Sequence, residues 1–244
     1  MLFSEFIMFN FIIVLLFSTM KPFFIFFFIF LITAEAQVAS NDNHYLEDQF
    51  YMGVAYNLLL NKPSGVEQRN LSYGLQLGYI KDIPLNESRN VGLGIGLGYA
   101  VNNYYVNMLA TEDVNSNIIY SLNTDIEFKR SKIETHLIEL PVEFRWRTST
   151  SEEYKFWRVY AGAKLGYIFG ARSKYVSGKN KVSFSNIDIK DMHYGLTLNF
   201  GYNTWNIHVY YQLNKLFSDG VIIAGSLDEI DARPLRIGVI FYIL

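Results

Sequence analysis

Residues 91–99 read V-G-L-G-I-G-L-G-Y, so large apolar or aromatic side chains alternate strictly with glycine. A period of two is typical of a β-strand, because successive side chains point to opposite faces of the sheet. One face of this strand is continuously apolar from Val91 to Tyr99, whereas the other face has no side chains. Such a bare face weakens a strand unless another group approaches it closely. The segment therefore predicts a strand that separates two very different surroundings.

Seven further segments alternate in the same way between a bulky apolar face and a small or polar face. With the glycine strand, the predicted strands are residues 50–58, 71–79, 91–99, 138–147, 157–170, 193–202, 205–214 and 235–243. Aromatic residues stand at the ends of the apolar faces, which is where the interfacial girdles of a membrane barrel lie. A soluble barrel of the lipocalin kind, the alternative, would instead turn its apolar face inward.

The connections between these segments alternate in length. Three are short, and four are longer and more polar, among them residues 102–135 and 172–192. An even number of antiparallel strands closes a sheet and removes its edges. We therefore predict an all-β fold, an eight-stranded antiparallel up-and-down transmembrane β-barrel in the outer membrane of a Gram-negative cell. Its termini and short turns are expected in the periplasm and its long loops outside.

The composition of the 244 residues narrows the function classes. Half of the residues are hydrophobic, 17% are aromatic, there is no cysteine, and the formal net charge is -2. The lack of cysteine excludes disulfides and thiolate metal sites, and the small net charge argues against nucleic acid as a partner. We expect no cofactor and no metal site, and we expect the outer-membrane lipid to be a partner.

The N-terminal region is typical of an export signal. The apolar run of residues 23–32 follows Met20-Lys21-Pro22 and precedes the small-residue ending Ala34-Glu35-Ala36. This pattern predicts a signal peptide over residues 1–36, with Met20 as the true start. Residues 37–47 are then a short periplasmic lead and residues 48–244 the barrel. The competing interpretation, a membrane anchor, needs a longer uninterrupted apolar run.

Charged side chains fall on the small or polar faces and are therefore predicted to lie in the lumen. This lumen network consists of Glu139, Glu143, Arg145, Arg158, Lys164, His208 and Arg236. If Trp146 lies opposite Trp157, then Glu143 lies opposite Tyr160 and Glu139 opposite Lys164. If residues 203–204 form a tight turn, then Asn199 lies opposite His208 and Thr197 opposite Tyr210. The network is either a compensated ionic plug in a lumen without a hydrocarbon core, or a gate or ion path.

No catalytic constellation emerges from the histidines, so the chain is not expected to be an enzyme. His136, beside Glu134 and Thr135 near the outer rim, is the one position where a lipid-directed site would be built. The run L-G-I-G-L-G at 93–98 matches a nucleotide fingerprint superficially, but its strict period of two makes it a strand.

The final strand resembles the C-terminal assembly signal of outer-membrane proteins, in which Arg236, Gly238, Phe241 and Ile243 match the polar, glycine and apolar positions. That likeness implies recognition by the barrel-assembly machinery. The segments E-D-Q-F-Y-M-G at 47–53, E-L-P-V-E-F-R-W-R at 139–147, F-W-R-V-Y-A-G at 156–162 and G-Y-N-T-W-N at 201–206 resemble the PorT-like, or porin-family, outer-membrane β-barrel proteins of Bacteroidota.

This resemblance implies a role as an accessory of protein secretion of the type IX kind, with secretion-machine subunits as partners. A second possibility is an envelope scaffold that acts through its extracellular loops. Residues 102–132 and 172–192 are long enough to build a binding surface above the membrane, where function concentrates on a rigid barrel. The alternative function is a narrow channel for small solutes or ions.

Overall fold

A computed structural model describes residues 49–68, 70–122, 128–148, 156–177, 180–226 and 228–243. The predicted signal peptide and periplasmic lead, residues 1–47, lie outside the described residues. The strands are β1 (Gln49–Leu60), β2 (Tyr73–Pro84), β3 (Val91–Val106), β4 (Met108–Glu112), β5 (Ile118–Leu122), β6 (Phe128–Arg147), β7 (Trp157–Ser177), β8 (Asn180–Ser185), β9 (Met192–Tyr202), β10 (Trp205–Gln212) and β11 (Arg233–Ile243). In this part of the chain, no helix is long and apolar enough to cross a membrane.

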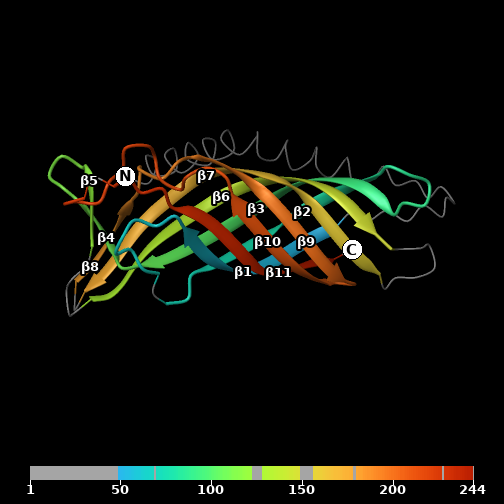
Figure 1. Ribbon diagram of the computed structural model, residues 1–244, viewed down its shortest axis with the longest axis horizontal. Helices are drawn as coiled ribbons and strands as arrows, with labels where there is room; N and C mark the ends of the chain where they lie inside the picture. The colour runs from blue at the N-terminus through green and yellow to red at the C-terminus, as the bar shows by residue number, and fades with distance from the viewer. Residues whose placement is uncertain are drawn as a thin grey trace, which may run out of the picture. The chain divides into compact units, whose positions relative to one another are not determined.

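Eight of these strands form a closed antiparallel barrel (Figure 1). The order around the wall is β6-β3-β2-β1-β11-β10-β9-β7, and β6 pairs with β7 to close the ring. Each wall strand pairs with its neighbours in the chain, and the first pairs with the last. The predicted eight-stranded up-and-down barrel is confirmed. β4 and β5 form a separate hairpin, and β8 pairs with the far end of β7.

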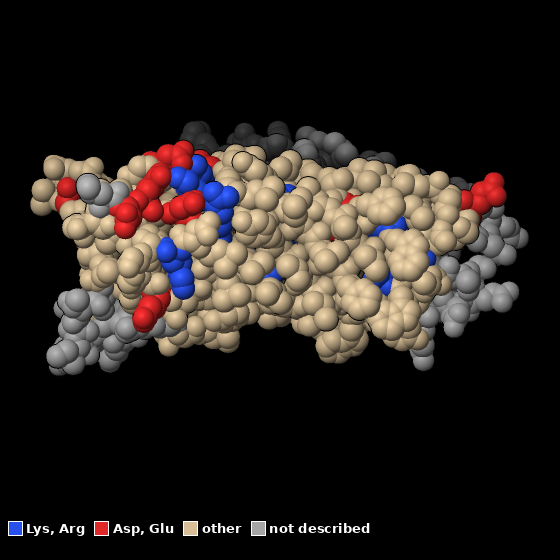
Figure 2. All heavy atoms as spheres, in the orientation of Figure 1, with Lys and Arg blue, Asp and Glu red and all other residues tan. Residues whose placement is uncertain are grey.

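The bulky apolar faces point out of the barrel. Along β1, the outward Phe50 is 64% exposed and the inward Tyr51 only 3%. Figure 2 shows the result on one side, where uncharged residues cover most of the wall and charged residues gather near the end that carries β4, β5 and β8. An outward apolar face of this extent is what a lipid-facing wall requires. The lipocalin-like alternative is therefore wrong.

Three wall strands extend far past their predicted ends on the side of the long connections. β3 continues to Val106, β6 begins at Phe128, and β7 continues to Ser177. The segments expected to be loops, 102–135 and 172–192, therefore contain strand extensions as well as β4, β5 and β8. We call the end of the barrel that carries these segments the loop end, and the opposite end, with its short connections, the turn end.

The pairing of β6 with β7 differs from the predicted register by two residues. Trp146 lies opposite Val159, so the predicted partners Glu143 and Tyr160 are offset. The connection between β6 and β7 is too long to fix the register from the sequence. In the structure the pairing ends with a hydrogen bond from the Thr148 amide to the Trp157 carbonyl oxygen. A shift of two residues keeps every side chain on its predicted face. At the tight turn after β9, the predicted pairs of Asn199 with His208 and Thr197 with Tyr210 are confirmed.

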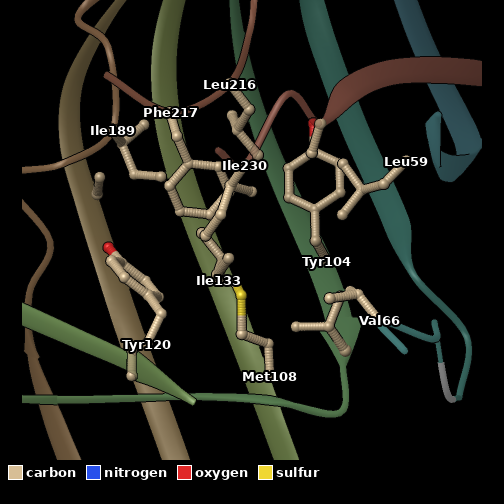
Figure 3. Packing of buried hydrophobic residues seen from close by; sticks show 14 of the residues in the cluster. Leu59, Val66, Tyr104, Met108, Tyr120, Ile133, Ile189, Leu216, Phe217 and Ile230 are labelled. Carbon is tan, nitrogen blue, oxygen red and sulfur yellow. The ribbon is translucent and has the colours of Figure 1, made fainter. Parts of the chain in front are cut away.

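The interior has two chemically different parts. Toward the turn end it is dominated by buried charges, with a small hydrophobic cluster among them that includes Tyr51, Tyr160 and Tyr242, and toward the loop end it is dominated by apolar side chains. We call the apolar part the loop-end core (Figure 3), whose buried members are Leu59, Val66, Ala100, Tyr104, Val106, Met108, Ala110, Tyr120, Ile133, Leu137, Ile168, Ala171, Ile189, Leu216, Phe217, Ile223, Ile230 and Ala232. The expectation of a lumen without a hydrocarbon core is wrong for this end. Many of these residues come from the connections, whose packing strand alternation does not reveal.

Candidate functional site

Charged side chains fill the polar part of the lumen. Among the described residues, eight are buried there with at most 4% of their surface exposed, namely Asp82, Glu139, Glu143, Arg145, Arg147, Arg158, Lys164 and Arg236. Burying charge is costly unless each group is paired and hydrogen-bonded. The contacts of these side chains therefore decide whether the interior is a plug.

Glu139 on β6 is the centre of one cluster. It accepts hydrogen bonds from Lys164 Nζ at 2.8 Å and from Arg236 Nη2 at 2.9 Å. Lys164 also donates to Gln76 Oε1 at 2.8 Å. The guanidinium of Arg236 lies 3.8 Å from the ring centroid of Tyr210, a cation–π distance. These contacts join β2, β6, β7, β10 and β11 across the barrel axis.

Asp82 on β2 is the centre of a second cluster toward the turn end. It accepts hydrogen bonds from Arg145 Nη1 at 3.2 Å and Arg147 Nη2 at 2.7 Å. Arg145 Nε also donates to Glu143 at 3.2 Å. The other oxygen of Glu143 accepts from Asn199 Nδ2 at 3.1 Å. His208 belongs to the same cluster.

His208 Nδ1 lies 2.6 Å from Asn199 Oδ1, which extends the second cluster to β10. Arg158 stacks on aromatic rings, with its guanidinium 4.5 Å from the centroid of Phe156 and 5.8 Å from that of Tyr242. The structure thus gathers all seven predicted lumen residues inside the barrel. Across the eight buried charges, five cations face three anions, so this part of the lumen carries a positive excess.

The bare face of the glycine strand lines the lumen. A Cβ placed at Gly94 would lie 2.5 Å from Arg145 Nε, and a Cβ at Gly98 would collide with the hydroxyl of Tyr51. Arg145 and Tyr51 therefore occupy the space that side chains on β3 would need. Lys164 and Arg158, two long cations on the inner face of β7, make their contacts elsewhere.

Three contributors to the lumen were missed in the sequence. Asp82 lies beyond the predicted strand 71–79, whereas Gln76 and Arg147 lie within predicted strands but are not part of the predicted lumen network. The alternation of β2 in fact continues past Tyr79, and it places Ile80 and Asp82 on the inner face. Following the period of two to its end would have found Asp82.

The residues of the predicted assembly signal divide between the two faces of β11. Arg236 and Gly238 face the lumen, and Ile243 faces outward with 48% of its surface exposed. Phe241 packs edge-on against Trp205, with 4.6 Å between the ring centroids. Besides its place in the predicted assembly signal, Arg236 donates a hydrogen bond to Glu139 inside the lumen.

Of the residues of the predicted lipid-directed site, only His136 and Glu134 lie together, with 3.6 Å between His136 Nε2 and Glu134 Oε1. Thr135 is buried on the inner face, whereas His136 and Glu134 point outward. His136 Nδ1 lies 2.7 Å from the hydroxyl of Tyr99. In the part of the chain that is described, no group of three or more His, Cys, Asp or Glu is placed to hold a metal ion.

Glu134 instead forms ion pairs beyond the apolar band. Its two oxygens accept hydrogen bonds from Lys132 Nζ at 2.6 Å and Lys174 Nζ at 2.9 Å. Partial burial raises the pKa of Glu134, but the hydrogen bonds and charges of the two lysines outweigh burial and hold the pKa at about 2. The carboxylate is therefore ionised at neutral pH.

The chain has low similarity to several solved structures. The Ail attachment invasion locus protein of Yersinia pestis is 15% identical, with a TM-score of 0.36 over 82% of this chain and 100% of that chain. A mutant Rh. blastica porin is 8% identical, with a TM-score of 0.21 over 82% of this chain and 100% of the porin. No curated protein matches the sequence. Residues 35–218, more than half of the chain, match the family described as "Outer membrane protein beta-barrel domain". The chain therefore belongs to this family of outer-membrane β-barrel proteins.

Proposed function

We propose that the protein is a non-enzymatic outer-membrane barrel that is plugged inside and binds another protein through its loop end. The observation that carries this proposal is the loop-end core. Loops that only connect strands need no shared core, whereas a binding surface has to be held in one shape. In this protein the connections and the strand extensions pack on one another around apolar side chains.

The β4–β5 hairpin illustrates how firmly this end is held. Tyr120 on β5 donates a hydrogen bond to Asn186 Oδ1 at 3.0 Å and packs edge-on against Phe217, with 5.5 Å between ring centroids. Ser131 Oγ on β6 donates to the carbonyl oxygen of Met108 at 2.7 Å. The hairpin is thus fixed to three other parts of the chain, and its tip is presented to solvent.

Apolar side chains are also exposed around this end. Val114 at the hairpin tip is fully exposed, and Ile187 is 74% exposed. Exposed apolar residues on a fixed support are typical of a protein-binding surface. We propose that the loop end faces the cell exterior, with the termini in the periplasm. The likeness to PorT-like proteins of Bacteroidota makes secretion-machine subunits of the type IX kind the first partners to test.

The test is affinity purification of the tagged barrel from its native membrane in mild detergent. We expect secretion-machine subunits to co-purify with the wild type and to be lost with the double variant Val114→Asp/Ile187→Asp. Leu85→Asp is the matched control, because Leu85 is 58% exposed at the turn end. Recovery that is the same for all three proteins, or absent for the wild type, would contradict the proposal.

A narrow channel remains the second candidate. It is favoured by buried polar atoms that have no hydrogen-bond partner among the described residues, such as Arg158 Nε and His208 Nε2, because such atoms are usually satisfied by water. Planar-bilayer recordings separate the two functions. Stable conductance that changes in Glu139→Gln or Arg158→Gln would establish a channel, and silent bilayers containing folded barrels would support the plug.

A further inference from the structure

Basic side chains cover the outward face of β6, β7 and β8 directly beyond the lipid-facing wall. The strand pairing arranges them in rows: Arg130 lies beside Val176 and Lys181, Lys132 beside Lys174 and Ser183, and Glu134 beside Arg172 and Ser185. We call this set the rim patch, with charged members Arg130, Lys132, Glu134, Arg172, Lys174 and Lys181. Five cations face one anion, so the rim patch is strongly positive.

Four other wall strands are uncharged on their outward face at the loop end, whereas on β11 the outward Arg233, opposite Leu60, is paired with Asp231 at 3.3 Å. The uncharged outward residues are Leu60 on β1, Leu71 before β2, Met192 on β9 and Leu213 after β10, all at least 36% exposed. The loop-end cations near β9, β10 and β11, which are Lys190, Lys215 and Arg233, are each paired with an acidic residue. Among the described residues, the rim patch is therefore distinguished by its excess of cations over anions.

A groove of about 710 Å³ opens between the rim patch and the apolar wall, lined by residues that include His136, Phe169, Gly170, Arg172 and Ser185. It exists because β9 stops pairing with β7 at Tyr167 and β8 starts only at Arg172. A register shift between β6 and β7 falls at the same level. Gly170 has no side chain to fill the gap. The groove in the wall thus results from the way in which β7 pairs with β6, β8 and β9.

The wall beneath the rim patch is aromatic. Tyr99, His136 and Phe169 pack together, with ring centroids 6.1–6.3 Å apart. Immediately below them, Ile138 and Tyr167 are about half exposed on the lipid-facing wall. Aromatic rings at this position mark the boundary between hydrocarbon and headgroups. The groove therefore lies where the headgroup of a lipid meets its chains.

We propose that the rim patch and its groove bind the phosphorylated headgroup of a membrane lipid. Lys and Arg are the side chains that pair best with phosphate oxygens, and the hydroxyls of Ser183 and Ser185 stand beside them. Glu134 holds Lys132 and Lys174 together, whereas Arg172 is exposed at the groove. The lipid-facing wall continues directly into the groove, which suits a ligand whose chains stay in the bilayer. The lipid would belong to the outer leaflet, because the loop end is proposed to face the cell exterior; this inference rests on that proposed orientation.

The test measures lipid binding to the purified full-length barrel in detergent micelles. The probes are bisphosphorylated lipid A and the same lipid without phosphates, titrated and followed by native mass spectrometry. We expect clear preference for the phosphorylated lipid. The double variant Arg172→Gln/Lys174→Gln should weaken its binding about tenfold or more, because each charge-assisted contact contributes that much. Equal binding of the two lipids would overturn the proposal.

Two further variants separate a built site from general positive charge. Gly170→Leu should block the groove and still fold, because a Cβ there would meet only His136, at 3.8 Å. Lys190→Gln/Lys215→Gln is the matched control, because these lysines pair with Asp219 in the loops and lie outside the rim patch. Weakening by the control as large as that by the rim variant, or unchanged binding in Gly170→Leu, would overturn the proposal.

A last arm distinguishes a lipid from a free anion. Inorganic phosphate added at the same concentration as the lipid should not displace it, and displacement would overturn a lipid site. Heat-modifiable gel migration verifies that every variant is a folded barrel. Since this assay needs no protein partner, a failure of the co-purification experiment leaves its result intact, and a failure of lipid binding leaves the partner proposal standing.

Discussion

Neutralising Glu139 tests whether the lumen is a dry ionic plug. Glu139→Gln keeps the shape of the side chain but removes the anion that faces Lys164 at 2.8 Å and Arg236 at 2.9 Å. Both cations stay buried, and the positive excess of the lumen grows by one charge. Removing one partner from a buried ion pair destabilises a protein by about 3–5 kcal/mol. We expect a loss in that range for Glu139→Gln.

Glu134→Gln is the matched control. Glu134 lies on the same strand and also accepts from two cations, at 2.6 Å and 2.9 Å, but its side chain is 14% exposed. Because water reaches this ion pair, the loss for Glu134→Gln should be smaller than the loss for Glu139→Gln. The free energy of unfolding is measured by reversible urea titration of the barrel in lipid vesicles, with tryptophan fluorescence and heat-modifiable migration as two readouts. A loss below about 1 kcal/mol for Glu139→Gln would refute the reasoning, because it would mean that water already solvates the cations.

Three further outcomes follow from the same contacts. Gly96→Ala should lower the refolding yield, because its Cβ would lie 2.5 Å from a backbone oxygen and overpacking costs about 1–3 kcal/mol. Gly170→Ala, the control, should refold normally. Tyr120→Ala should make residues 108–122 sensitive to protease while the barrel keeps its heat-modifiable migration; uncut loops would disprove the role of the loop-end core. The depressed pKa of Glu134, about 2 against an ordinary 4.5, gives stability that is present above pH 4.5 and lost as pH falls toward 2. The thermal unfolding temperature of Glu134→Gln should therefore not show this loss at low pH. An identical pH profile in the wild type and the variant would contradict the stabilising role of the Glu134 ion pairs.

The alternation of side chains was sufficient to predict the wall of the barrel. It gave the number of strands, their order and which face meets lipid, because period two is a local property of the backbone. Pairing register was predictable only where the turn is tight, as between Asn199 and His208, and failed where the connection is long. The lumen residues were found because inner-face parity survives a shift of two residues.

The remaining features depend on contacts between distant segments. Asp82 pairs with Arg145 and Arg147, more than 60 positions away, and nothing near Asp82 in the sequence announces that pairing. The loop-end core brings together Leu59 from the end of β1, Tyr120 from the β4–β5 hairpin and Ile230 from the connection before β11. Their apolar character was visible, but their convergence arises only when the closed wall gathers the ends of the strands.

The three longest wall strands change the chemistry of their inner face at the same place along the barrel. β3 passes from glycines at 92–98 to Ala100 and Tyr104 with the polar Asn102 between them, β6 from Glu139 to Leu137 and Ile133 with Thr135 between them, and β7 from Lys164 to Ile168. If the inner faces of these strands only had to fill the lumen, they could stay polar along their whole length. An apolar inner face at the loop end gives the connections a surface on which to pack away from water. The wall thus prepares a support for the loops, so the loop end can hold a fixed binding surface that does not depend on the charged plug.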